Sequence, residues 1–395
     1  MKELSKIASQ VQASTTLKVD SLFKQMKADG LDVVGFGAGE PDFDTPDNIK
    51  EAAYKAIRDG ETKYTPSNGI PALRQAAADR LLADCGISYT AGQIVVASGA
   101  KHNIYVALQT LLNPGDEVVL PAPFWVTYAE AIRMAGGIPI SVPATEASDF
   151  KITKDRFEAA VTDKTKLFIM NNPSNPTGTL YNADELRALA DVCVKHDLYI
   201  LSDEIYFSLV YDGRKFVSVA ALGEDVKART IIVNGVSKSY AMTGWRIGYS
   251  ASDAKIAEVM SNYLSHSTSA PSTISQFAAV EALTGPQEGI IAMHDVFEQR
   301  RNYIVERLNT IDGVSCRNPE GAFYVMINIE KLIGRTLGGR VINSSDDFSL
   351  AFLESGLVAV VSCDGFGCEN YVRMSYAASM ESIKEGLDRL EKFVR

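Results

Sequence analysis

The sequence predicts an α/β protein that has a mainly parallel sheet with helices on both faces, followed by a smaller α+β domain. Three observations support this fold class. The chain has 395 residues, more than one ordinary compact core contains, so about two domains are expected. Apolar runs of strand length alternate with amphipathic runs of helix length from residue 45 to residue 285. Beyond residue 285 the alternation gives way to a different pattern.

The strands expected in the first region are short and continuously apolar, which is typical of parallel strands covered on both faces. Several are followed by Gly, Pro or Asn and then by a helical pattern such as Ala183–His196. The expected strands are Ile94–Ala97, Glu117–Leu120, Leu167–Met170, Tyr199–Ser202, Thr230–Val233 and Arg246–Ser250. We therefore predict a large domain over residues 45–285.

The last part of the chain predicts a smaller α+β domain over residues 286–395. It is expected to contain a long polar helix, three strands and a closing helix, at Gly289–Leu308, Ala322–Ile329, Val358–Val361, Tyr371–Tyr376 and Met380–Val394. The glycine-rich segment Ile333–Ser345 predicts an exposed loop. Residues 1–44 remain as an N-terminal segment.

The composition excludes several classes of function. A net charge of -10 argues against a nucleic-acid-binding surface, because phosphate contacts need clustered Lys and Arg. The five cysteines and four histidines are scattered without the spacing of a metal site, so no metal is expected. The N-terminus lacks the apolar core of a signal peptide, and no stretch is long enough to span a bilayer. These features predict a cytoplasmic protein that does not bind membranes.

Two glycine-containing segments could bring backbone close to a ligand. FGAGEPDFDTP, at 36–46, has too many Gly and Pro residues for a regular element, although a plain interdomain connection would have the same composition. SGAK, from Ser98 to Lys101, follows an apolar strand and opens the expected helix Ala100–Leu111. Free amides at a helix start form an anion site, but the same letters also suit an ordinary strand-to-helix turn.

Two further segments place polar side chains at the carboxyl ends of strands, where ligands of α/β sheets tend to bind. NNPSNPTG, from Asn171 to Gly178, constrains the backbone tightly and points to Asn175 as the side chain being aimed. In SDEIY, from Ser202 to Tyr206, one buried aspartate could pair with a cationic ring nitrogen, or it could simply cap the next helix.

The fourth segment, NGVSKSYAMTGWRIGY at 234–249, holds Lys238 in a loop rich in Ser and Gly between two apolar strands. Lysine normally prefers exposed helix faces, so this position is unusual. A single lysine in a loop is nevertheless more often a solvated surface group.

Taken together, in their order and spacing, these segments resemble the class I, fold-type I aminotransferases that use pyridoxal 5'-phosphate. The resemblance is to the branch that contains many bacterial aspartate aminotransferases, and it extends from GAGEPDFDTP to NYVRMSYA. NPSNPTG, SDEIY and SKSYAMTGWRIGY, in that order, make a coincidental match improbable.

The resemblance implies a role for each residue around the cofactor. Lys238 would carry pyridoxal phosphate as a Schiff base and, once the substrate amine has displaced it, act as general base and acid. Asp203 would keep the pyridine nitrogen protonated, while Tyr206 and Asn175 would contact the phenolic oxygen. Trp125 would stack on the ring, or would otherwise be an ordinary core aromatic. The remaining implied cofactor residues, mainly at the phosphate, are Gly99, Ala100, Ser237, Arg246 and Tyr64.

The resemblance also implies substrate contacts and a homodimer, because Tyr64 would reach the phosphate from the neighbouring subunit. Arg373 and the backbone of Gly39 would bind the α-carboxylate, next to Trp125 and Asn175. Lys101 would meet the distal carboxylate of an acidic substrate. Ser14 and Thr16 would assist from an N-terminal segment that belongs to the small domain and closes over the site. The sequence reads SGAKH where SGGKQ is usual in the family, so His102 leaves the surroundings of Lys101 open.

We therefore predict a cytoplasmic homodimer that transfers the amino group of L-aspartate to 2-oxoglutarate by a ping-pong reaction. An aminotransferase for aromatic amino acids, alanine or prephenate stays open, since the α-carboxylate site is shared. A fold-type I C–S lyase and a regulatory protein that binds the cofactor as a ligand stay open as well. By resemblance, and because Trp125 and Asn175 must turn inward, the bonds Ala122–Pro123 and Asn175–Pro176 are predicted to be cis.

Overall fold

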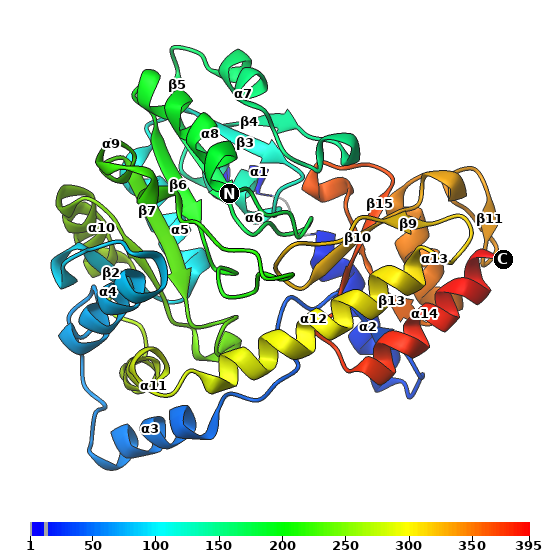
Figure 1. The fold of residues 1–395 in the computed structure, drawn as a ribbon, viewed down its shortest axis with the longest axis horizontal. Coiled ribbons are helices and arrows are strands. Elements are labelled where there is room, and N and C mark those ends of the chain that lie inside the picture. Colours follow the sequence, from blue (N-terminus) through cyan, green and yellow to red (C-terminus); the bar gives the residue numbers. More distant parts are fainter. Residues whose placement is uncertain (1, 12–14) are drawn as a thin grey trace.

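The computed structural model describes residues 2–11 and 15–395. Figure 1 shows a larger part built around a twisted sheet and a smaller part that contains the C-terminus, with helix α12 (Glu288–Leu308) running from one toward the other. Within the described ranges, no helix is long and apolar enough to cross a membrane.

The sheet of the larger part has seven strands among the described residues, in the order β2-β8-β7-β6-β5-β3-β4. The neighbours from β7 to β4 are all parallel, whereas β8 runs antiparallel to both β2 and β7. The strands are β2 (Ile94–Ala97), β3 (Glu117–Ala122), β4 (Ile138–Pro143), β5 (Thr165–Asn171), β6 (Tyr199–Asp203), β7 (Thr230–Gly235) and β8 (Gly248–Ala251). The predicted fold class is confirmed.

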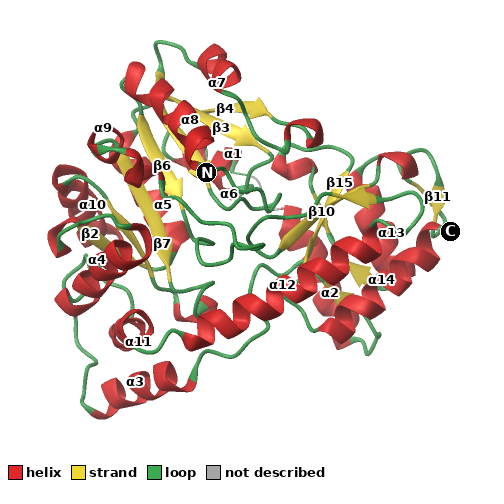
Figure 2. Cartoon of the chain, viewed as in Figure 1, coloured by secondary structure: helices red, strands yellow, loops and turns green. Residues whose placement is uncertain are grey.

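Helices cover both faces of this sheet, as the helices on either side of the strands in Figure 2 show. Alternate residues along a strand belong to different cores: Val118 packs in one cluster and Val119 in another. This is why the strands read as continuously apolar. One face carries α5 (Ala100–Leu111), α6 (Thr127–Met134) and α10 (Ala254–Ser267). The other carries α4 (Pro71–Cys85), α7 (Lys154–Ala160), α8 (Ala183–Lys195), α9 (Glu224–Lys227) and α11 (Thr273–Thr284), with α3 (Asp47–Arg58) packed on α11.

The smaller part is built on an antiparallel sheet of order β14-β15-β10-β9 in the described chain. These strands are β9 (Ser315–Cys316), β10 (Tyr324–Asn328), β14 (Val361–Ser362) and β15 (Tyr371–Ser375). Helices α12, α13 (Ser345–Gly356) and α14 (Met380–Val394) pack with it around one apolar core. A second small sheet pairs β1 (Val34–Gly35) with β13 (Val358–Ala359), which joins the N-terminal segment to the C-terminal part.

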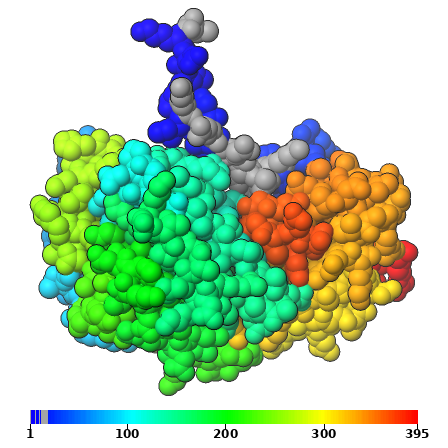
Figure 3. All heavy atoms as spheres, turned by 90° about the horizontal axis from the view of Figure 1, so that it is seen from above, coloured from blue at the N-terminus to red at the C-terminus, as the bar shows by residue number. Residues whose placement is uncertain are grey.

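The described residues of the N-terminal segment form two helices. Helix α2 (Thr15–Ala28) packs on α13 through a small cluster that contains Phe23 and Leu353. The stretch that contains α1 (Lys6–Gln10) projects from the body of the molecule in Figure 3. The predicted boundaries at residues 44 and 285 stay predictions.

Two expectations in the smaller part are wrong in detail. The run Val358–Val361 is not one strand: Val358 and Ala359 pair with β1, and Val361 pairs with β15, so the chain changes sheets at Val360. The segment Ile333–Ser345 is not a plain loop, because β11 (Thr336–Leu337) and β12 (Arg340–Val341) form a hairpin within it. Continuous apolarity cannot reveal which neighbour a strand pairs with, and two-residue strands lie below what periodicity resolves.

Candidate active site

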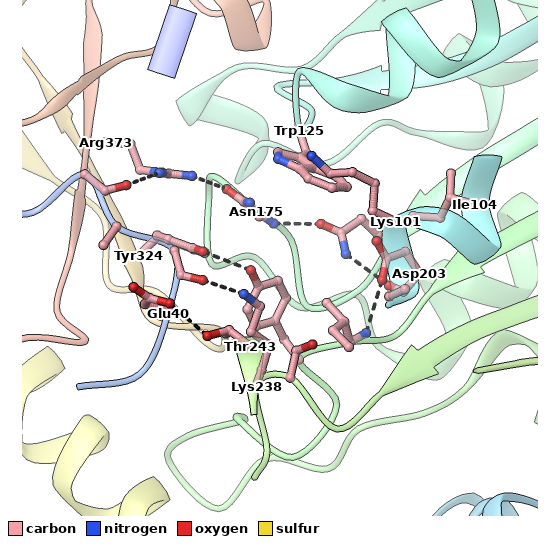
Figure 4. A pocket seen from close by; sticks show the side chains of 18 of the residues that line it. Glu40, Lys101, Ile104, Trp125, Asn175, Asp203, Lys238, Thr243, Tyr324 and Arg373 are labelled. Atoms are coloured by element: carbon pink, nitrogen blue, oxygen red, sulfur yellow. Dashed lines mark hydrogen bonds between the residues drawn. The ribbon is translucent and has the colours of Figure 1, made fainter. Parts of the chain in front are cut away.

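A cavity of about 430 Å³ lies between the carboxyl ends of the parallel strands and the smaller part (Figure 4). Asn171 ends β5, Asp203 ends β6, and Lys238 follows the end of β7, so all three reach the same edge of the sheet. The opposite wall comes from segment 37–40 and from β10 and β15. Predicted residues that line the cavity are Gly39, Ala100, Lys101, Trp125, Asn175, Asp203, Tyr206, Ser237, Lys238, Arg246 and Arg373.

Lys238 is held inside this cavity by its backbone loop and by one hydrogen bond. Its Nζ donates to the carbonyl oxygen of Gly39, across the gap between the two parts of the molecule. Burial lowers the pKa of Lys238 to about 8, while the carboxylate of Glu40 opposes the shift and the charges of Arg373 and Arg246 add to it. A sizeable share of the amine is therefore neutral near physiological pH and able to act as a nucleophile or base.

Asp203 is almost fully buried at the end of β6, 3% exposed. Tyr128 donates its hydroxyl hydrogen to Oδ2 at 2.6 Å, and the backbone N–H of Ile205 donates to Oδ1 at 3.2 Å. Burial raises the pKa of Asp203 to about 6, against the opposing effects of the Tyr128 bond, the Ile205 bond and the charge of Lys238. A buried carboxylate of this kind is stabilised by a cationic partner in the cavity.

Arg373 lies opposite, on β15, and is 4% exposed. Nη1 donates to Oδ1 of Asn175 at 2.9 Å and Nη2 donates to the carbonyl oxygen of Gly37 at 3.0 Å. Both acceptors are neutral, and Nε is buried without a partner among the described residues. A buried guanidinium with unused donors favours the carboxylate of a ligand.

A third group of residues forms an anion-binding corner at the start of α5. Gly99 has φ +90°, and a Cβ at this position would lie 2.5 Å from Nη2 of Arg246. Arg246 is fixed by donating from Nη1 to the carbonyl oxygen of Thr243 at 2.8 Å. The first amides of the twelve-residue helix α5 and the Arg246 guanidinium therefore meet at one corner, and Ser237 lines the same cavity.

Lys101 and Trp125 form the wall next to this corner. The Nζ of Lys101 lies 4.7 Å from the centroid of the Trp125 ring. Burial lowers the pKa of Lys101, and the nearby charge of Arg246 lowers it further. Trp125 follows a cis Ala122–Pro123 bond, and Asn175 precedes a cis bond to Pro176, as predicted. Asn172–Pro173 is also cis, which the sequence does not predict.

Four predicted residues are not among those that line the cavity. Gly99 lies directly before the lining residue Ala100, at the start of α5. Tyr64 is fully exposed, 100%, on the single chain. Ser14 lies outside the described residues, and of Thr16 only the backbone, at the start of α2, is described. Their roles stay predictions.

Sequence reasoning misses several residues that line the cavity, above all Glu40, Tyr128, Thr243 and Tyr324. Tyr128 is three positions after Trp125, which a helical spacing could have indicated. Tyr324 lies in an apolar strand and is inconspicuous in the sequence.

The family model for aminotransferase class I and II matches residues 31–390. The chain belongs to this family. Aspartate aminotransferase from Geobacillus stearothermophilus is 45% identical over 99% of this chain and 99% of that protein. Aspartate/prephenate aminotransferase from Cereibacter sphaeroides is 46% identical over 99% of this chain and 98% of that protein.

Solved structures of similar proteins have the same fold over the whole chain. The crystal structure of the aspartate aminotransferase from Rhizobium meliloti gives a TM-score of 0.96 at 40% identity, covering 100% of this chain and 99% of that chain. Aspartate aminotransferase from Thermus thermophilus with maleate gives 0.93 at 36% identity, covering 100% of both chains. These two aspartate aminotransferases therefore share the fold of both parts of the present chain.

Proposed function

We propose that this aminotransferase uses pyridoxal 5'-phosphate and moves the amino group of L-aspartate to 2-oxoglutarate, giving oxaloacetate and L-glutamate. The observation that carries the proposal is that Lys238, Asp203, Arg246 and Arg373 line one cavity. They complement, in turn, an aldehyde, a basic ring nitrogen, a phosphate and a carboxylate. The names of the similar proteins support aspartate as the donor.

The cavity fits each polar group of this cofactor. The buried Asp203 suits a protonated ring nitrogen, since its pKa of about 6 leaves it ionised at neutral pH. The corner at Gly99 and Arg246 suits the phosphate, because a side chain at Gly99 would fill the space that the anion needs. Tyr206 and Asn175 are proposed to donate to the phenolic oxygen, and Trp125 to cover one face of the ring.

Bound there, pyridoxal phosphate would supply a protonated ring that withdraws electrons from the substrate Cα. Asp203 would hold the proton at the ring nitrogen by its negative charge. Lys238 would hold the group covalently until the substrate amine displaces it, and its Nζ would then take the proton from the substrate Cα and deliver a proton to the C4' carbon of the cofactor. Its lowered pKa, about 8, keeps the neutral amine available for this task. The same amine serves both half-reactions, as a ping-pong sequence requires.

The two substrate carboxylates have separate proposed partners. Arg373 would bind the α-carboxylate with its unused donors, and the Gly39 backbone would contact the same group. Lys101, a cation at the far wall beside Trp125, would bind the distal carboxylate of aspartate or 2-oxoglutarate. Ser14 and Thr16 are proposed to assist from the N-terminal segment, which would close over the site with the small domain.

Prephenate is a second candidate substrate, because several similar proteins are named aspartate/prephenate aminotransferases. Prephenate also carries two carboxylates, so Arg373 and Lys101 would serve it in the same way. Aromatic amino acids and alanine would use Arg373 alone. A C–S lyase would use the same Lys238 chemistry without an amino acceptor.

The proposed active unit is a homodimer in which Tyr64 of one subunit reaches the phosphate corner of the other. Its full exposure on the single chain supports an intermolecular role. We also infer a cytoplasmic location, supported by five cysteines that are all free, as expected in a reducing compartment.

The test is a panel of amino donors assayed with 2-oxoglutarate and the purified, cofactor-loaded protein. Aspartate should give the highest kcat/KM, and Lys238→Ala should abolish turnover. Turnover of a β-substituted amino acid without any oxo acid would instead identify a lyase. Full activity of Lys238→Ala would overturn the proposed mechanism.

A further inference from the structure

Tyr324 lies between the two groups of residues that the proposed function assigns to cofactor and substrate. It is 1% exposed and lies on β10, at the wall of the cavity (Figure 4). Its hydroxyl lies 2.9 Å from the hydroxyl of Tyr206. The guanidinium carbon of Arg373 lies 4.4 Å from the centroid of its ring. A Cβ at Gly39 would lie only 2.8 Å from its hydroxyl oxygen, so glycine makes room for Tyr324 as well.

The bond between the two hydroxyls has a direction that matters for chemistry. Each phenol has one hydrogen, so only one of the pair donates in their mutual bond. If Tyr206 donated to Tyr324, its hydrogen would point away from the ligand. If Tyr324 donates, the Tyr206 hydrogen is free to point to a ligand oxygen in the cavity, and the bond that Tyr206 accepts makes it a stronger donor.

The surroundings of both rings leave little freedom for other arrangements. The Tyr206 ring packs edge-on against the rings of Phe323 and Tyr324, with ring centroids 5.4 Å and 5.8 Å apart, respectively. The charged groups that act on the Tyr206 hydroxyl are Arg373 and Asp203. Tyr324 itself is fixed between Tyr206, the Arg373 guanidinium and the Gly39 backbone.

We propose that Tyr324 is a positioning residue that acts through two neighbours: its hydroxyl donates to Tyr206 and thereby aims the Tyr206 hydrogen at the ligand, while its ring supports the Arg373 guanidinium. The inference rests on the proposed function, in which Tyr206 contacts the phenolic oxygen of the cofactor. It assigns the two parts of one side chain to two tasks, the hydroxyl to the cofactor and the ring to the substrate.

Tyr324→Phe separates these tasks, because it removes the hydroxyl and keeps the ring. The visible absorption of the bound cofactor should titrate at a pH higher by about 0.5 to 1 unit, since a weaker donor at Tyr206 stabilises the phenolate less. The KM for aspartate should stay within about twofold, because the ring still lies under Arg373. Tyr324→Leu, which also removes the ring, should raise that KM as well.

The matched control is Tyr376→Phe, a buried tyrosine of the same core whose hydroxyl donates to the carbonyl oxygen of Ala322 at 3.2 Å. It loses a buried hydroxyl outside the cavity, so its cofactor should titrate as in the unaltered protein. An equal shift in Tyr376→Phe would show a general packing effect and overturn the proposal.

A double-mutant cycle with Tyr206→Phe gives the decisive comparison. If Tyr324 acts through Tyr206, then adding Tyr324→Phe to Tyr206→Phe should shift the titration no further. An undiminished shift in that background, or none in Tyr324→Phe alone, refutes the inference and leaves the proposed function intact. An unaltered protein that shows no cofactor absorption dependent on Lys238 would refute the proposed function itself, and this inference with it.

Discussion

Asp203 is a single carboxyl group whose burial has a measurable consequence for stability. Its pKa of about 6 is above the ordinary value of 3.8, so the folded protein binds its proton more tightly than the unfolded chain does. Asp203 therefore favours the fold below pH 4, and this contribution is lost as the pH rises through about 6. Above that pH, the cofactor-free protein must bury an ionised carboxylate.

We accordingly expect Asp203→Asn to stabilise the cofactor-free protein at pH 8, by on the order of 1–3 kcal/mol. The gain should shrink as the pH falls from 6 to 4. Urea denaturation of both proteins from pH 8 down to pH 4 measures this difference in the free energy of unfolding. The same variant should bind the cofactor more weakly, because the ring nitrogen loses its anionic partner. A gain in stability that does not change with pH would contradict the raised pKa.

Lys101 should decide the preference for acidic substrates. In Lys101→Met, the kcat/KM for aspartate should fall by about 10- to 100-fold, the range expected for a lost charge-assisted hydrogen bond. Alanine, which lacks the distal carboxylate, should lose much less. Lys255→Met removes the same charge from an exposed pair with Glu258 and serves as the control. Parallel losses for both amino acids would remove Lys101 from the proposed specificity site.

At the scale of secondary-structure elements, the start of α5 carries the proposed phosphate site. Gly99 has a positive φ, which L side chains rarely adopt, and Gly99→Ala would also place a Cβ against the Arg246 guanidinium. The affinity for the cofactor should therefore fall at least about tenfold. Gly86, at the end of α4, has φ +70° and open space around it. Gly86→Ala should therefore lower stability by about 1 kcal/mol and leave cofactor affinity unchanged. Equal affinities in the two variants, measured by equilibrium dialysis, would exclude Gly99 from the site.

The same elements explain how much the sequence could predict. The strands β2, β5, β6 and β7 are readable because burial on both faces makes them continuously apolar, and α5 because an apolar face follows a glycine. The run Val358–Val361 is predicted as one strand but pairs with two different strands, because amino-acid composition does not indicate which strand a residue pairs with. Hydrophobic periodicity predicts where helices and strands lie in the sequence, but not which of them are neighbours in space.

The candidate site follows the same division. Lys238, Asp203 and Asn175 are predictable because each lies in a conspicuous loop at a strand end, and the resemblance assigns their roles. Tyr324 and Tyr128 are not, because a tyrosine in an apolar strand or helix is also an ordinary core residue. Their significance depends on which hydroxyl or carboxylate the fold brings beside them.

At the scale of the whole molecule, the proposed dimer can be tested by mixing two inactive variants, because only a mixed dimer would contain a complete active site. Tyr64→Ala and Lys238→Ala should each give little or no activity as homodimers. A mixed dimer would pair Lys238 of one subunit with Tyr64 of the other and so contain one complete site. After random reassociation of equal amounts, about a quarter of the unaltered activity should return. Mixtures that stay as inactive as their components would show that Tyr64 does not act across the interface.

The cavity also joins the two parts of the molecule, since Arg373 comes from the small sheet and Asp203 and Lys238 from the large one. Among the residues that the structure describes, Arg373 donates to two neutral acceptors and keeps its Nε without a partner. The charge and the free donor of this guanidinium suit any small carboxylate that fits the cavity, not the substrate alone. Acetate, formate or citrate in a buffer would bind it in competition with the amino acid. The choice of buffer anion would then alter the apparent KM for the amino acid, and a buffer without carboxylates would remove this competition.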